Sequence, residues 1–251
     1  MLKKTFLLCC ASLLALASFS QTVEESLAQA KQLTLQMKET EALQQYKDIL
    51  QADPGNVTAL NQSSLICSRE GARQKDKSAK MEWFNNAKIF AYEAMKVDVE
   101  NPESNYAMAL AWARIAQISG AKEKVAAARE VKKYVDLAIK FKPDYGEAFH
   151  LLGKWNFDIY NLSSIEKAAA KVLFGGMPAA TLEDAIANYE KCRQLTPSFI
   201  LNYLDLAIAF RQNNQETQAM EILNKAMRLR PIYQDDPGYK AECKKLLDSM
   251  Q

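Results

Sequence analysis

The sequence predicts an all-α protein, an α-solenoid made of successive helix pairs. Five segments share one spacing, in which a small or apolar residue is followed by similar residues after four, three and five further positions. Only 8 Gly and 7 Pro occur in 251 residues, and no long stretch shows the alternation of a β-strand. The hydrophobic content of 49% and the charged content of 25% are ordinary for a globular domain.

Each of the five segments predicts a helix that packs closely on another helix and then stops. Small residues let two helix backbones approach, and a proline cannot continue a helix. This is the pattern of the second helix of a tetratricopeptide repeat. The segments are Ala42, Tyr46, Ile49 and Pro54; Ala87, Ala91, Ala94 and Val99; Val131, Val135, Ala138 and Pro143; Ala185, Tyr189, Cys192 and Pro197; and Ala219, Leu223, Ala226 and Pro231.

The first helix of each pair is expected before the second. Pro197 and Pro231 are 34 residues apart, which is the period of the repeat. We expect about four and a half units and a capping helix after Pro237. The first helices are marked by Leu60, Ser63, Ser64 and Cys67; Asn105, Met108, Ala109 and Trp112; Phe149, Leu152 and Gly153; and Tyr203, Leu206, Ala207 and Phe210.

The other closing residues are 45, 44 and 54 positions apart, so three units contain insertions. Residues 71–80 and 119–128 predict longer helix ends or loops. Residues 163–174 predict an extra amphipathic helix, closed by Gly175 and Gly176 and followed by a capping box at Thr181 and Asp184. Its apolar face either packs onto the array or covers a binding groove. That face consists of Ile165, Ala168, Ala169, Val172 and Leu173.

The first twenty residues have the layout of a secretory signal peptide. Lys3 and Lys4 precede a short apolar run, and Ser18 and Ser20 stand at the positions expected before a cut at Gln21. The run is short for a membrane span of about 20 residues. We therefore expect residues 1–20 to be removed and residues 21–251 to form the domain in the periplasm or another exported location. An uncleaved anchor is the alternative.

Charge and cysteine content exclude several classes of protein. Removing Lys3 and Lys4 from 32 basic residues leaves 30, against 30 acids, so no broad attraction to nucleic acid is expected. Cys67 and Cys192 occupy helix-packing positions, which favours small buried side chains over a disulfide framework. A cross-link of Cys243 is left open.

Catalytic and cofactor-binding motifs are absent from the sequence. His150 is the only histidine, and neither a phosphate-binding loop nor a dinucleotide fingerprint occurs. The adjacent carboxylates Asp235 and Asp236 are interpreted as solvated charges. We expect a protein that is not an enzyme and that uses neither a cofactor nor a metal.

The repeat register predicts a groove, because the first helices line the concave side of such an array. Its lining is mixed, an apolar track with several basic ends, which suits a peptide with a carboxylate or an acyl chain with an anionic head. The lysine–asparagine clamp of chaperone-binding repeats is not expected. The groove residues are Asn61, Leu65, Arg69, Tyr106, Leu110, Arg114, His150, Lys154, Phe157, Leu201, Leu204, Ile208 and Arg211.

One stretch carries a resemblance to a known family. Residues 150–157, with a leucine-glycine-x-tryptophan sequence, continue through residues 161–178 and 181–185 in a pattern that resembles the regulator of microtubule dynamics family. The resemblance covers roughly residues 43–231. It implies a repeat domain that binds proteins and, in some eukaryotic relatives, membrane anchoring and lipid binding.

The sequence thus predicts an exported scaffold that holds a protein or peptide in its concave groove, peripheral to a membrane at most. Two alternatives are a lipid or small apolar ligand beneath the inserted helix, and an adaptor that uses its convex face.

Overall fold

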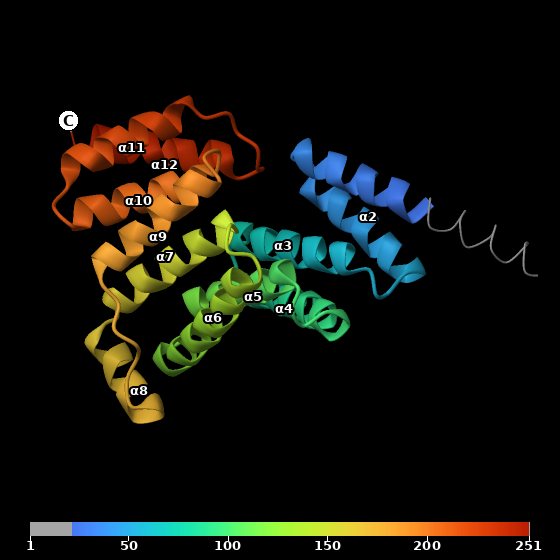
Figure 1. Cartoon of the computed structure of the whole chain (residues 1–251), viewed down its shortest axis with the longest axis horizontal. Helices are drawn as coiled ribbons and strands as arrows, with labels where there is room; N and C mark the ends of the chain where they lie inside the picture. Colours follow the sequence, from blue (N-terminus) through green and yellow to red (C-terminus); the bar gives the residue numbers. More distant parts are fainter. Residues whose placement is uncertain (1–21, 251) are drawn as a thin grey trace, which may run out of the picture.

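The computed structural model of the chain describes residues 22–250, which form helices joined by loops and contain no strand (Figure 1). The all-α prediction is confirmed for these residues, whereas the expected signal peptide lies outside them. Residues 22–35 form the first helix. It is followed by α2 (Glu39–Ala52), α3 (Val57–Arg73), α4 (Lys77–Val97), α5 (Pro102–Ile118), α6 (Ala121–Phe141), α7 (Gly146–Tyr160), α8 (Ser164–Phe174), α9 (Leu182–Leu195), α10 (Ile200–Gln212), α11 (Glu216–Arg228) and α12 (Asp236–Asp248).

The helices pack in the predicted pairs. Helix α3 packs on α4, α5 on α6, α7 on α9 and α10 on α11, while α12 caps α10 and α11. Residues 22–35 complete a fifth pair with α2, where four and a half units were expected. Leu27, Ala30 and Leu33 of this helix pack with Leu43 and Tyr46. Their spacing of three residues is helical, so the signal for this helix was present in the sequence.

The small residues and closing residues act as the repeat pattern predicts. Helices α2, α4, α6 and α9 each end two positions before their closing residue, and α11 ends three before it. A methyl group on Gly153 of α7 would lie 2.8 Å from the ring of Tyr189 and 3.1 Å from the carbonyl oxygen of Ala185, both on α9. Glycine is therefore required for the close approach of α7 and α9.

Two of the three insertions lengthen helices, as expected. Helices α4 and α6 each have 21 residues, whereas α2 has 14 and α11 has 13. The third insertion is the predicted helix α8, which Ser163 and Glu166 start with a capping box. Gly175 ends α8 in the left-handed conformation, at φ 73°.

The apolar face of α8 points into solvent, so both interpretations of that face were wrong. Ile165 is 74% exposed, Val172 is 83% exposed and Leu173 is 44% exposed, and none of them covers the cavity described below. Helix α8 instead attaches to α6 through its opposite side. Ala170 is buried, and Lys124 Nζ lies 2.6 Å from Glu166 Oε1. Periodicity identified the apolar face, but the partner of that face depends on contacts that the pattern does not contain.

The three cysteines of the described part of the chain are buried and unpaired. The interpretation of Cys67 and Cys192 as packing residues is confirmed, and Cys243 is likewise buried in the core with Leu204 and Leu247. Burial raises the pKa of the Cys67 thiol to about 12, so this thiol is not poised to react.

Candidate binding cavity

The concave side of the array contains a cavity of about 850 Å³. Its walls come from the first helices α3, α5, α7 and α10, together with α6, the turn before α7 and residues 233–239. The volume lies within the range of about 300–1,000 Å³ that is common for small-ligand and peptide-side-chain pockets.

Eight of the thirteen predicted groove residues line this cavity. They come from the four helices α3, α5, α7 and α10, which the fold thus brings together around one cavity. These residues are Leu65, Arg69, Tyr106, Leu110, Arg114, His150, Lys154 and Leu201.

The other five predicted residues lie elsewhere. Asn61 is buried and donates from Nδ2 to Asn101 Oδ1 over 3.3 Å, and Phe157 packs against the C-terminal core. Leu204 is buried in that core with Leu247 of α12. Ile208 and Arg211 are exposed, and Arg211 Nη1 donates to Ser249 Oγ over 3.3 Å. Helix α12 covers the side of α10 on which a ligand was expected, and the repeat register contains no information on the position of a capping helix.

One part of the cavity wall is apolar. Its side chains belong to the core that joins α5, α6 and α7, and Trp155 Nε1 donates to the carbonyl oxygen of Ala128 over 2.7 Å. That bond satisfies the indole N–H and leaves only the ring to face the cavity. The apolar wall consists of Leu110, Val131, Leu151, Trp155, Ile159 and Leu162.

The basic groups of the cavity differ in how far they are neutralised. Lys154 pairs with Asp158, and Arg69 Nε lies 2.6 Å from Glu39 Oε1. Arg114 is not in an ion pair with any described residue. Its Nη1 donates to Gln117 Oε1 over 3.3 Å, and its buried Nε has no acceptor. Of the two arginines that line the cavity, Arg114 is therefore the one whose charge is available to an anionic ligand.

His150 is a neutral structural residue. Its Nδ1 lies 3.2 Å from Asn202 Oδ1, and Asn202 Nδ2 donates to the carbonyl oxygen of Tyr189 over 2.9 Å. Burial lowers the pKa of His150 to about 3 and raises the pKa of Asp205, 3.5 Å away, to about 6. The His150–Asp205 contact is thus not an ion pair, and His150 is a buried polar residue at the edge of the cavity.

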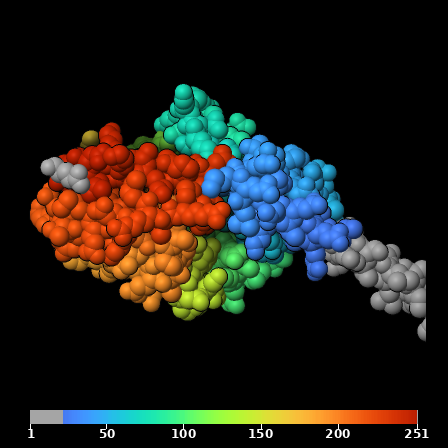
Figure 2. Space-filling model, turned by 90° about the horizontal axis from the view of Figure 1, so that it is seen from above, coloured from blue at the N-terminus to red at the C-terminus, as the bar shows by residue number. Residues whose placement is uncertain are grey.

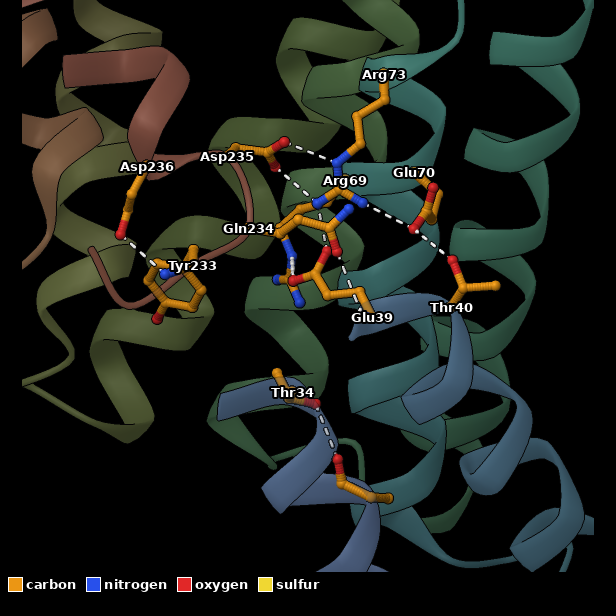
Figure 3. Close-up of polar contacts among 11 residues, drawn as sticks. Thr34, Glu39, Thr40, Arg69, Glu70, Arg73, Tyr233, Gln234, Asp235 and Asp236 are labelled. Carbon is orange, nitrogen blue, oxygen red and sulfur yellow. Dashed lines mark hydrogen bonds and ion pairs between the residues drawn. The ribbon is translucent and has the colours of Figure 1, made fainter. Parts of the chain in front are cut away.

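A polar cluster closes the array by joining its two ends, which meet in Figure 2 where the C-terminal residues contact the N-terminal helices. Glu39 of α2 is 1% exposed and pairs with both Arg69 and Arg73 of α3 (Figure 3). Arg73 Nε lies 2.7 Å from Asp235 Oδ1, and Arg73 Nη2 lies 2.9 Å from Asp235 Oδ2. We call Glu39, Arg69, Arg73 and Asp235 the closure cluster. Because Arg69 and Asp235 also line the cavity, the cluster forms part of its wall.

The interpretation of Asp235 and Asp236 as solvated charges was wrong. Asp235 is bound by Arg73, and Asp236 is fully buried. Asp236 Oδ2 accepts hydrogen bonds from the backbone N–H groups of Ile232 and Tyr233, at 2.8 and 2.9 Å. The partner of Asp235 is 162 positions away in the sequence, so local pattern could not reveal it.

Comparison with known proteins identifies the family. The family described as "Regulator of microtubule dynamics protein 1-3" matches residues 26–251. The chain belongs to this family. It is 30% identical over 138 residues to regulator of microtubule dynamics protein 2 of Bos taurus, covering 55% of this chain and 34% of that protein. It is 28% identical over 158 residues to regulator of microtubule dynamics protein 1 of Caenorhabditis elegans, covering 63% and 70%. The match thus spans about a third of the bovine relative.

A solved structure supports the fold. The thermophilic tetratricopeptide-repeat protein TTC0263 of Thermus thermophilus superposes with a TM-score of 0.64 at 14% identity, over 89% of this chain and 99% of that chain. This regulator of microtubule dynamics relative is therefore a tetratricopeptide-like solenoid. In the part of the chain that the structure describes, no helix is both long and apolar enough to span a bilayer. The same part contains no cluster of three or more His, Cys, Asp or Glu side chains placed to hold a metal ion.

Proposed function

We propose that this family member is a non-enzymatic scaffold that holds a short segment of a partner protein in its concave cavity. The fold supports a role in protein binding, since stacked helix pairs present an extended concave surface. The observation that carries the proposal is Arg114, whose charge has no counter-ion among the described residues and whose buried Nε has no acceptor. A carboxylate of the partner would supply both.

The cavity lining supports a segment with two kinds of group. A guanidinium binds a carboxylate through two parallel N–H bonds, and the apolar wall offers area to a neighbouring side chain. We therefore propose a C-terminal carboxylate or an acidic side chain at Arg114, next to an apolar residue at the Leu110–Trp155 wall.

The proposed location is the cell envelope. Support for this comes from the layout of residues 1–20, with two lysines, a short apolar run and small residues before Gln21. The names of the relatives refer to microtubule dynamics. The leader instead favours a partner in the envelope, and we propose no binding to microtubules.

Charge reversal at two arginines tests the cavity. Arg114→Glu changes a cavity residue, whereas Arg211→Glu changes an exposed arginine outside the cavity and serves as the matched control. A charge-assisted contact contributes about 1.5–3 kcal/mol, so Arg114→Glu should weaken binding at least roughly tenfold. The readout is mass spectrometry of material that co-purifies with each variant from its native envelope. Equal recovery of the partner with both variants would move the binding site to the convex face.

The second candidate is an acyl or other apolar ligand with an anionic head, which the apolar wall favours. The same mass spectrometry distinguishes it, because lipid and protein give different signals. If lipid co-purifies and Leu110→Gln releases it, this candidate replaces the peptide.

A further inference from the structure

Two nearly buried tyrosines present unused hydroxyls to the cavity. Tyr106 of α5 is 7% exposed and Tyr145, in the turn before α7, is 9% exposed; both line the cavity. Their ring centroids lie 5.0 Å apart and the ring planes are tilted by 53°. Neither hydroxyl makes a hydrogen bond with another described residue. Neither hydroxyl oxygen is fully buried, so both are open to the cavity and can bond a group held there.

A carboxylate without a partner lies at the same end of the cavity. Glu147, in the first turn of α7, lines the cavity and makes neither a hydrogen bond nor an ion pair with any described residue. It is close enough to the tyrosines to affect them, since burial and then the charge of Glu147 raise the pKa of Tyr106 and of Tyr233. One acceptor-only group and two hydroxyls thus line the same cavity.

The chemistry of these groups selects a cation. A carboxylate can only accept hydrogen bonds, a tyrosine hydroxyl can accept one, and an ammonium or guanidinium supplies three to five N–H donors. Aromatic faces also attract cations through the ring quadrupole. A neutral amide satisfies fewer of these groups, and an anion is repelled by Glu147.

Arg69, Arg114 and Lys142 are the resident cations near this space, and none of them is paired with Glu147. Arg69 lies over the ring of Tyr233, 5.6 Å from its centroid, but its charge is matched by Glu39. Lys142 Nζ lies 4.9 Å from the centroid of Tyr145 and is bonded to no described carboxylate. Lys142 is therefore a competitor for the site rather than its occupant.

We infer that the space bounded by Tyr106, Tyr145 and Glu147 binds an alkylammonium or guanidinium group, so that the segment held in the cavity carries a basic residue near its carboxylate. The second half of this inference rests on the proposed function, with the carboxylate at Arg114. The first half concerns the cation alone and can be tested without the partner.

The test uses n-butylammonium chloride as the probe, 1-pentanol as a neutral probe of similar length and sodium butyrate as an anionic one. The full chain is labelled with ¹³C in its tyrosine rings, and the Tyr106 and Tyr145 signals are assigned from Tyr106→Phe and Tyr145→Phe. Titration with n-butylammonium should shift both signals to saturation, whereas 1-pentanol should not. Any shift caused by sodium butyrate, which the proposed function places at Arg114, should be the same in Glu147→Gln as in the wild type. Glu147→Gln should weaken the apparent affinity at least fivefold, and the exposed control Glu221→Gln should leave it unchanged.

Three results would overturn the cation site. The first is an equal shift with 1-pentanol, and the second is an unchanged affinity for n-butylammonium in Glu147→Gln. The third is loss of n-butylammonium binding in Lys142→Met, because this variant is expected to bind the probe at least as tightly as the wild type. A different result would contradict the proposed function, namely that Arg114→Glu still retains the partner protein. The two hypotheses can be told apart because Arg114→Glu should not weaken the binding of n-butylammonium. Circular dichroism of each variant confirms that the helices are intact.

Discussion

Replacing Arg73 with methionine should open the closure cluster and destabilise the protein. Arg73 binds three carboxylates, those of Glu39, Glu70 and Asp235, from three parts of the chain. Breaking a buried ion pair from one side costs about 3–5 kcal/mol because a charge stays buried without a partner. Arg73 is 21% exposed and Arg69 still neutralises Glu39, so we expect a smaller loss of about 2–3 kcal/mol.

Thermal denaturation followed by circular dichroism measures the effect. For a domain of this size each kcal/mol corresponds to about 2–4 °C, so the melting temperature should fall by roughly 4–12 °C. Small-angle scattering should show a larger radius of gyration, since the polar cluster joins the two ends of the array. The control is Lys225→Met, which removes an exposed pair with Glu221 and should change the stability by less than about 0.5 kcal/mol. If both variants melt alike and scatter alike, the cluster does not close the array.

Three further predictions test packing, proton linkage and maturation. Ala219 is fully buried, so Ala219→Trp should cost about 1–3 kcal/mol or more by overpacking; an unchanged melting temperature would contradict the repeat register. Between pH 6 and 4 the unfolded chain carries a proton on His150, whereas the folded chain carries one on Asp205 instead. The reason is that folding lowers the pKa of His150 to about 3 and raises the pKa of Asp205 to about 6. In the wild type these two groups thus bind equal numbers of protons in the unfolded and folded states. Asp205→Asn removes the proton of the folded state, so the free energy of unfolding of this variant should fall by up to about 1.4 kcal/mol per pH unit as the pH falls. Urea denaturation at each pH measures this, and a profile parallel to that of the wild type would contradict the assignment. Intact-mass measurement of envelope material should give a chain that begins at or near Gln21, and retention of Met1 would exclude cleavage.

The candidate cavity could be predicted in part from the sequence. The register identified the concave faces of α3, α5 and α7, and with them Leu65, Arg114 and Lys154. At α10 only Leu201 lines the cavity, because Leu204 is buried there in the core with Leu247 of α12. The register also missed Tyr145 and Glu147, which follow Pro143 at the start of α7 and lie outside the positions that the repeat motif defines.

The sequence by itself determined the helix pairs, their ends and the existence of the inserted helix. The spacing of small residues, prolines and caps acts within one helix or between the two helices of one pair, and this information is present in the order of residues along the chain. Examples are Gly153 opposite Tyr189 and the capping box at Ser163.

Only the tertiary structure decided how the array closes and which face of α8 is exposed. Closure depends on Arg73 meeting Asp235, and the exposure of Val172 depends on which side of α8 contacts α6. Closure follows from the curvature that small rotations between successive helix pairs add up to. Because each rotation is set by packing in three dimensions, contacts between the ends of the array cannot be read from local periodicity.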